Sequence, residues 1–197
     1  MPPENEDRDA IARAVAGDRE AFGVLVKKYE GRILSVLTGM LRDSEAAREV
    51  AQEVFLKAFR SIGDFKGDAS FYTWAYRIAI NLAIDRQRSE QRRPLSQVVR
   101  PGMGREGDAE PDLVERQQDM HPSADPFEAT KDGELRDRVQ QAIAGLTPDH
   151  RAVILLREVE GLSYDEISKV LQCSKGTVMS RLHYARRKLQ AELKDFL

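Results

Sequence analysis

Residues 163–182 read SYDEISKVLQCSKGTVMSRL, and this stretch decides the fold of the C-terminal part of the chain. Ser163 followed three positions later by Glu166 is a capping box, which predicts the start of a helix of about eight residues. A tight turn comes next and ends at Ser174, a suitable N-cap for a longer helix from Lys175 onward. A short helix, a tight turn and a longer helix have the spacing of a helix-turn-helix.

The longer helix of this unit is basic. Between Lys175 and Lys188 it carries five cationic side chains and no acidic one. Such a charge suits neutralisation of DNA phosphates, and side chains near the helix start are those that reach base edges. On an ordinary helical hairpin the same residues would form a solvated face, so both interpretations stay open. The candidate DNA-contacting residues are Ser174, Lys175, Thr177, Met179, Ser180, Arg181, His183, Tyr184 and Arg187.

Upstream of this unit the helical pattern gives way to proline, glycine and acidic residues. Nine acidic side chains stand against four basic ones between positions 96 and 132. Low apolar content combined with net charge cannot offset the entropy of ordering, so residues 96–131 are expected to form a flexible acidic linker. The linker divides the chain into two expected domains, residues 1–95 and residues 132–197.

Both expected domains are predicted to be helical. Ala, Leu, Glu, Arg and Lys dominate them, and the alternation typical of strands is absent. The fold class is therefore all-α, with two small helical domains joined by a flexible acidic linker. Helices are expected over about 9–16, 20–41, 44–60, 70–93, 135–144, 149–159 and 164–171, and from 175 onward.

A dense aromatic cluster opens the helix that is expected after the break at residues 63–70. Four aromatic side chains fall within the six positions 71–76, and arginine and asparagine side chains follow on one helical face. Aromatic rings beside a basic stripe are the composition of a single-strand stacking platform, but aromatic residues at helical spacing are equally typical of a core. The candidate contact residues are Phe65, Ser70, Phe71, Tyr72, Trp74, Arg77, Asn81, Arg88 and Arg92.

A polar stripe runs along the helix expected over 44–60, on the side opposite an apolar face. On its pattern alone this stripe is a solvated surface, as most polar helix faces are. Its members are Glu49, Gln52, Glu53, Lys57 and Arg60, and the apolar face comprises Val50, Val54, Ala58 and Ile62.

Composition excludes several classes of protein. Lys and Arg number 31 against 33 Asp and Glu, for a net charge of -2, so the chain is not basic throughout. A mean hydropathy of -0.52 and short apolar runs exclude a membrane protein, and the single cysteine excludes an internal disulfide. The N-terminus lacks the pattern of a signal peptide, so a cytoplasmic protein is expected. His121, His150, His183 and Cys173 fit no common metal or nucleophile pattern, so we expect no enzyme, metal or cofactor.

Taken together, these segments resemble an extracytoplasmic-function (ECF) sigma factor of the sigma-70 family, similar to the envelope-stress group. The segments EVAQEVF at 49–55 and FYTWAYRIAIN at 71–81 resemble region 2 of that family. The segments LTP at 146–148, LLREVEGLSYDEI at 155–167 and GTVMSRL at 176–182 resemble region 4. Only the expected linker has no counterpart.

The resemblance implies a non-enzymatic subunit that binds core RNA polymerase and directs it to promoters. Region 2 would bind the clamp of the largest subunit through Glu49, Gln52, Glu53 and Lys57. It would also read and melt the −10 element through the candidate contact residues named above for the aromatic cluster. Region 4 would read the −35 element as duplex through the second helix of the helix-turn-helix and would contact the flap of the second-largest subunit. The implied partners are core polymerase, promoter DNA and an anti-sigma factor, with no small-molecule substrate.

Two further points qualify this expectation. Many relatives carry arginine where this chain has Met179, which offers a base only an apolar contact, for example with a thymine methyl group.

A stand-alone helix-turn-helix regulator with a helical sensor domain would explain residues 132–197 equally well. That alternative does not explain the aromatic and arginine residues at 71–93.

Overall fold

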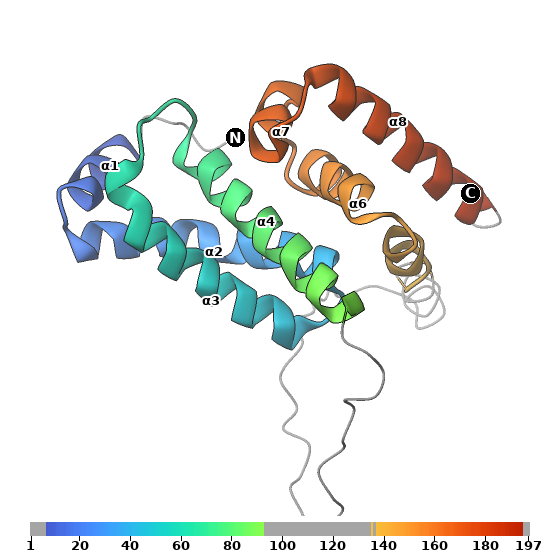
Figure 1. Ribbon diagram of the computed structural model, residues 1–197, viewed down its shortest axis with the longest axis horizontal. Coiled ribbons are helices and arrows are strands. Elements are labelled where there is room, and N and C mark those ends of the chain that lie inside the picture. The colour runs from blue at the N-terminus through green and yellow to red at the C-terminus, as the bar shows by residue number, and fades with distance from the viewer. Residues whose placement is uncertain (1–6, 93–134, 136, 195–197) are drawn as a thin grey trace, which may run out of the picture.

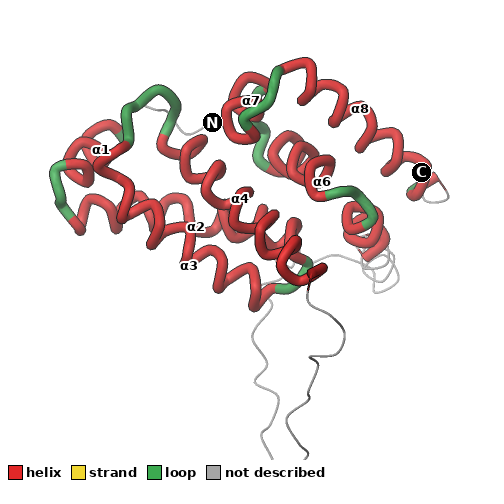
Figure 2. Tube along the Cα trace, viewed as in Figure 1, coloured by secondary structure: helices red, strands yellow, loops and turns green. Residues whose placement is uncertain are grey.

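The computed structural model describes residues 7–92, 135 and 137–194, and every structural statement below concerns these residues (Figure 1). All regular elements within them are helical, so the predicted all-α class is confirmed (Figure 2). The predicted linker, 96–131, lies outside the described residues, as do the domain boundaries placed beside it.

Four α-helices form the N-terminal bundle: α1 (Arg8–Val15), α2 (Arg19–Leu41), α3 (Ser44–Ser61) and α4 (Phe71–Arg92), with a short 3₁₀ turn, η1 (Ile62–Asp64), after α3. Asp18 and Asp43 start α2 and α3, because each carboxylate accepts hydrogen bonds from two backbone N–H groups of the following turn. Arg42, in the left-handed conformation with φ 65°, ends α2 and lets α3 turn back against it.

The aromatic residues at the start of α4 form the centre of this bundle. Phe71 and Tyr76 are almost fully buried, and the ring of Phe71 contacts those of Phe22 and Tyr29 at centroid distances of 6.3 and 5.7 Å. Aromatic pairs at such distances add to the stabilisation that burial provides. The predicted apolar face of α3, with Val50, Val54 and Ala58, is also confirmed as buried, so α3 and α4 enclose the core together with α2.

The C-terminal unit contains a helix over residues 137–144, then α6 (Pro148–Ile154), η3 (Leu155–Val159), α7 (Tyr164–Leu171) and α8 (Lys175–Glu192). The capping box of α7 and the N-cap of α8 at Ser174 are confirmed. The turn between these helices is closed by Gln172, which adopts the left-handed conformation with φ 50°. The short helix α7, this tight turn and the longer helix α8 therefore form the predicted helix-turn-helix.

The single helix expected over 149–159 is not continuous. Its second half, η3, is a π-helical turn, in which the N–H of Glu160 donates to the carbonyl of Leu155 five residues back, at 3.2 Å. The wider turn changes the direction of successive side chains, so that Leu155 and Leu156 are both buried while Val159 is exposed. Burial of two adjacent leucines against neighbouring helices explains the departure from a regular α-helix.

The two helical parts pack directly against each other. In Figure 1, α7 lies beside the first half of α4, α6 lies to the right of α4 and below α8, and α8 runs along the outer side of the C-terminal unit. The packing is close enough that a Cβ atom on Gly39 of α2 would come within 2.8 Å of the Leu155 side chain. One continuous core therefore joins the N-terminal bundle to the C-terminal unit, an arrangement that the sequence pattern did not predict.

Candidate nucleic-acid interface

The N-terminal end of α8 is presented to solvent by its capping residues. The hydroxyl of Ser174 accepts a hydrogen bond from the N–H of Thr177 at 3.1 Å, and the hydroxyl of Ser180 donates to the carbonyl of Thr177 at 3.0 Å. These hydroxyl groups therefore shape the helix start as well as lying on its surface. Most of the candidate side chains are exposed, namely Ser174, Lys175, Met179, Ser180, His183, Tyr184 and Arg187, whereas Thr177 and Arg181 are half-buried.

Most of the cationic side chains of α8 form ion pairs with acidic residues of the C-terminal unit. Lys175 pairs with Asp165 at 2.9 Å, and Arg181 pairs with Asp149 at 3.1 Å. Exposed pairs of this kind contribute roughly 0–1 kcal/mol, so phosphate oxygens can replace the carboxylates. Within the described residues Arg187 has no such pair, and it is the α8 arginine most available to a phosphate. Arg186 and Lys188 bind Glu158 and the carbonyl of Gly145.

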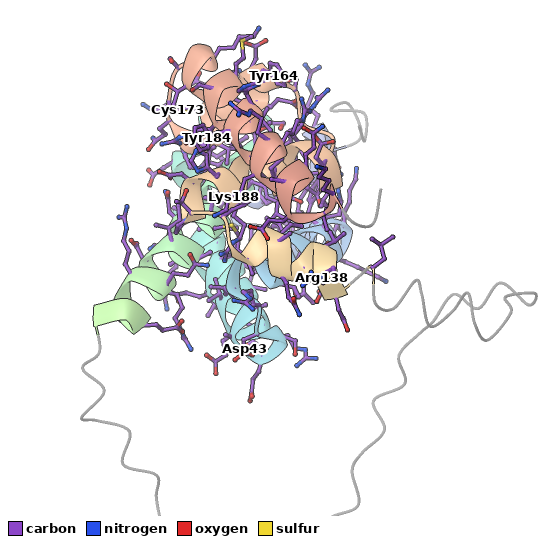
Figure 3. The ribbon with its side chains drawn as sticks, turned by 90° about the vertical axis from the view of Figure 1, so that its right-hand side faces the viewer. Asp43, Arg138, Tyr164, Cys173, Tyr184 and Lys188 are labelled. Atoms are coloured by element: carbon purple, nitrogen blue, oxygen red, sulfur yellow. The ribbon has the colours of Figure 1, made fainter. Side chains whose placement is uncertain are left out.

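The phenol ring of Tyr184 on α8 faces solvent, since this residue is 64% exposed. It stacks on the imidazole of His150 at 5.5 Å and 14° between planes, and Nδ1 of His150 lies 2.7 Å from the hydroxyl of Thr147. Tyr184 is thus held in one orientation by α6 and its N-cap. Figure 3 shows Tyr184 and Lys188 along the side of α8, well separated from Asp43 at the other end of the molecule.

A second surface lies where the loop 63–70 meets α4. Ser70 caps this helix, since its hydroxyl accepts from the N–H of Thr73 at 3.1 Å. The ring of Phe65, in the loop, meets the ring of Trp74 edge-on at 5.4 Å. Next to these two rings is a cavity of about 520 Å³, which Arg77 also lines. The loop and α4, together with Lys169 and Gln172 of the C-terminal unit, therefore form a hollow with aromatic walls and a guanidinium at its edge.

The candidate contact residues of α4 divide into surface and core. Trp74 and Arg77 are half-buried at the cavity, and Asn81 and Arg88 are exposed on the same helical face. Arg92 is the last residue of α4, and its side chain lies outside the described part of the structure.

Phe71 and Tyr72 are a correction to the sequence-based assignment. They are only 1% and 5% exposed, because their rings pack inward on the aromatic core. In this structure they position α4 and present no ring face to a base.

The polar stripe on α3 contains an apolar residue that the sequence analysis overlooked. Glu49, Gln52, Glu53 and Lys57 are exposed as expected, and Glu49 pairs with Arg86 of α4 at 3.3 Å. Leu56 lies at the centre of the stripe, seven positions after Glu49 and three after Glu53, with 56% of its surface exposed. Phe59 flanks it, at 38% exposure. The sequence did contain a signal for this residue, because Leu56 is an apolar side chain at a polar position of an amphipathic helix.

Other kinds of site were sought in the same residues. The part of the chain that the structure describes contains no group of three or more His, Cys, Asp or Glu side chains able to hold a metal ion. None of its helices has the length and apolarity needed to cross a membrane.

Comparison with known proteins assigns a family to each helical part. Residues 25–93 match Sigma-70 region 2, and residues 136–189 match Sigma-70, region 4. The RNA polymerase sigma-H factor of Pseudomonas aeruginosa is 39% identical over 197 residues, covering 100% of this chain and 98% of the relative. The ECF RNA polymerase sigma-E factor of Escherichia coli K12 is 34% identical over 198 residues, covering 100% and 99%.

Solved structures share the arrangement of helices. CnrH, solved in complex with the cytosolic domain of CnrY, gives a TM-score of 0.67 at 25% identity, over 96% of this chain and 97% of that chain. The sigma factor RpoE of Bartonella quintana, crystallised with the anti-sigma factor NepR, gives a TM-score of 0.62 at 20% identity, over 88% and 96%. Because both sigma-70 regions are present and a relative aligns along the whole chain, the protein belongs to the ECF sigma factor family and is an alternative sigma factor that directs transcription initiation.

Proposed function

We propose that this sigma factor uses three separate surfaces: α3 for core RNA polymerase, the loop 63–70 with α4 for the −10 element, and the start of α8 for the −35 element. The observation that carries the proposal is the cavity beside Phe65, Trp74 and Arg77. A stand-alone helix-turn-helix regulator has no use for a second, aromatic-walled surface in its other domain.

At the −10 element the cavity would receive a base taken out of the duplex. Extrusion of a base costs a few kcal/mol, which stacking on an aromatic ring and hydrogen bonds to the base edge recover. Phe65 and Trp74 supply the rings, and the amide of Asn81 supplies both a donor and an acceptor. Arg77 and Arg88 lie on the same face and would neutralise the phosphates of the captured strand.

At the −35 element α8 would enter the major groove with its N-terminal end. Ser180 and His183 are exposed there and can hydrogen-bond base edges, whereas Met179 can only contact an apolar group such as the thymine methyl. Arg187 lies further along the helix and would contact phosphate, which fixes position without reading sequence. Region 4 would also contact the flap of the second-largest polymerase subunit.

On α3 the clamp of the largest subunit would bind around Leu56. A protein interface typically has an apolar centre and a polar rim. Leu56 provides the centre, and Glu49, Gln52, Glu53 and Lys57 provide the rim. Arg86 of α4 forms an ion pair with Glu49 and so helps to orient its side chain.

The remaining parts of the proposal concern partners and location. The protein would act as a non-enzymatic subunit, in the cytoplasm, where core polymerase and promoter DNA meet. An anti-sigma factor would be a further partner, in line with the complex in which RpoE of Bartonella quintana was solved.

The deciding experiment combines purified protein, core polymerase and promoter fragments. We expect promoter-specific run-off transcription and permanganate-reactive thymines at −10 only when both proteins are present. Sedimentation of the free protein as a monomer would agree with this function. A symmetric dimer that shifts a palindromic duplex without polymerase would instead establish the stand-alone regulator.

A further inference from the structure

Tyr184 lies on the same outward face of α8 as Ser180 and Arg187. The three residues stand at positions i, i+4 and i+7 of the helix, and all three are exposed. The function proposed above assigns Ser180 to base edges and Arg187 to a phosphate. At 1.5 Å per residue, Tyr184 is about 6 Å along the helix from Ser180 and about 4.5 Å before Arg187. A duplex that contacts both of these side chains therefore passes the phenol ring between them, closer to the phosphate than to the bases.

A residue outside the helix-turn-helix fixes the direction of this ring. The imidazole of His150, in the first turn of α6, lies nearly parallel to the ring of Tyr184, with 5.5 Å between centroids and 14° between planes. An offset stack of this kind is a favourable arrangement of two aromatic rings. Because His150 covers one face of the phenol, the exposed part of Tyr184 lies on the side away from α6.

The supporting imidazole is itself held in place. Its Nδ1 lies 2.7 Å from the hydroxyl oxygen of Thr147, and the same oxygen accepts a hydrogen bond from the backbone N–H of His150 at 3.4 Å. Pro148, between the two residues, fixes the backbone φ at the start of α6. Side chains whose supports are locked by packing and hydrogen bonds keep the geometry that a binding site needs. His150 is therefore a rigid support for Tyr184.

Two neighbours of Tyr184 on α8 are tied to the same segment, residues 145–150. Arg181, three positions earlier, pairs with Asp149 at 3.1 Å, and Lys188, four positions later, donates to the carbonyl of Gly145 at 2.6 Å. Figure 3 shows Tyr184 and Lys188 along this side of the helix. Within residues 7–92, 135 and 137–194, the hydroxyl of Tyr184 has no hydrogen-bond partner. Tyr184 thus combines a fixed ring with a polar group that remains available to a ligand.

The chemistry of a phenol suits the DNA backbone at this place. Tyrosine hydroxyl groups donate hydrogen bonds to phosphate oxygens, which fixes the register of a protein on the duplex without reading sequence. A neutral donor neutralises no phosphate and releases no counterion, unlike arginine. A side chain that is already ordered before binding avoids the entropy cost of ordering it in the complex.

We propose that His150 is a positioning residue for the −35 element: it holds the ring of Tyr184 so that the Tyr184 hydroxyl donates to a phosphate oxygen at the edge of the major groove. This inference rests on the assignment of α8 to the −35 element in the function proposed above, whereas the stacked pair itself does not.

The test uses the full chain assembled with core polymerase. The probe is a promoter duplex whose −35 sequence was selected with the wild-type holoenzyme from a randomised library, and whose −10 region is mismatched so that melting does not limit binding. Tyr184→Phe keeps the ring and removes the hydroxyl. His150→Ala removes the supporting ring, and His150→Phe restores a ring at that position. Gln140→Ala, at an exposed position of the helix over 137–144, is the control.

We expect Tyr184→Phe and His150→Ala each to weaken binding by about fivefold, the size of one hydrogen bond or one ordered side chain. The slope of log affinity against log salt should stay unchanged in both, whereas Arg187→Ala should reduce it by about one. His150→Phe should recover to within about twofold of wild type, and Gln140→Ala should equal wild type.

A double-mutant cycle distinguishes positioning from a separate structural effect. If His150 acts through the hydroxyl of Tyr184, the double variant His150→Ala with Tyr184→Phe should bind about as well as either single variant, because both changes remove one contact. Losses that multiply to about 25-fold would overturn the proposal, since His150 would then act independently of Tyr184. Full affinity of Tyr184→Phe would overturn it as well.

The same assay separates failure of this inference from failure of the proposed function. Normal binding by the Tyr184→Phe and His150→Ala proteins, together with weakened binding by Ser180→Ala and Arg187→Ala, would reject the positioning role and keep α8 at the −35 element. Normal binding by all four variants would instead reject the assignment of α8.

Discussion

The guanidinium of Arg151 on α6 donates to the main-chain carbonyl of Met40 on α2 at 2.6 Å, across 111 residues of sequence. Arg151 is only 7% exposed and also donates to the carbonyls of Ala144 and Leu146. Arg151 therefore donates to carbonyls at the C-terminal ends of two helices, α2 in one half of the molecule and the helix over 137–144 in the other. Burial lowers the pKa of this arginine, which remains a cation because its ordinary value is so high.

Replacement of this residue should be costly. We expect Arg151→Leu to lower the free energy of unfolding by roughly 3 kcal/mol, because the carbonyls of Ala144 and Leu146 would lose this donor, while that of Met40 would keep only Gln87. Chemical denaturation measures the change. Arg187→Leu on the exposed side of α8 is the control and should stay within roughly 0.5 kcal/mol of wild type. A comparably small effect of Arg151→Leu would mean that water reaches these carbonyls.

Asn81 should be required for promoter melting. We expect Asn81→Ala to abolish permanganate reactivity of −10 thymines, since a flipped base would lose its donor and acceptor, while binding to core polymerase is retained. Ser89→Ala, at another exposed position of α4, is the matched control. Thymines that stay reactive in the Asn81→Ala complex would place base capture elsewhere.

The face of α3 should determine affinity for polymerase. Leu56→Ser and Glu53→Lys should each weaken binding to core polymerase by about tenfold or more, which corresponds to a loss of at least about 1.4 kcal/mol of binding free energy. Both side chains are exposed, so the melting temperature should not move. Val24→Ser on α2 removes an equally exposed apolar side chain and serves as control. Equal affinities for the Leu56→Ser and Val24→Ser proteins would remove the clamp assignment.

Residues along α8 should separate into those that read sequence and those that do not. His183→Ala and Ser180→Ala should change the preferred −35 sequence, whereas Arg187→Ala should weaken binding to all sequences and reduce its salt dependence. Met179→Arg should add a preference for guanine, worth roughly 1–3 kcal/mol. Selection of bound sequences from a randomised −35 library measures these effects. An altered preference in the Arg187→Ala protein would show that the helix is docked differently.

Tyr72, whose hydroxyl accepts a hydrogen bond from Arg32, gives a pH dependence with a defined direction. Burial raises the pKa of Tyr72 to about 12, above its ordinary value near 10. The protonated hydroxyl therefore stabilises the folded state at pH values below about 10, and this contribution is lost as the pH rises toward 12. We expect the free energy of unfolding to fall over that range, and to fall less in Tyr72→Phe. Equal alkaline losses in both proteins would mean that other groups cause the change.

Local features of the fold could be predicted from sequence because they depend on neighbouring residues. The capping box at Ser163 and Glu166 and the N-cap at Ser174 need only a few adjacent positions, and they were predicted correctly. The exposure of the α8 face and the apolar face of α3 follow from helical periodicity.

Features that depend on distant residues could not be predicted in this way. The pattern places Phe71 and Trp74 in one cluster, but only the packing of α2 shows that the first is core and the second borders a cavity. Arg32 and Glu160 are separated by 128 residues, and no local pattern relates them. The same holds for the π-helical turn, where Leu155 packs against Gly39 of the other half.

The absence of a side chain at Gly39 has a consequence for comparing chains of this family. A Cβ atom there would come within 2.8 Å of the buried Leu155 side chain, so a larger residue at 39 requires another rotamer of Leu155, a smaller residue at 155 or a wider separation of the helices. The pair of residues at these two positions thus becomes a marker, readable from sequence, of how closely α2 and η3 can approach each other.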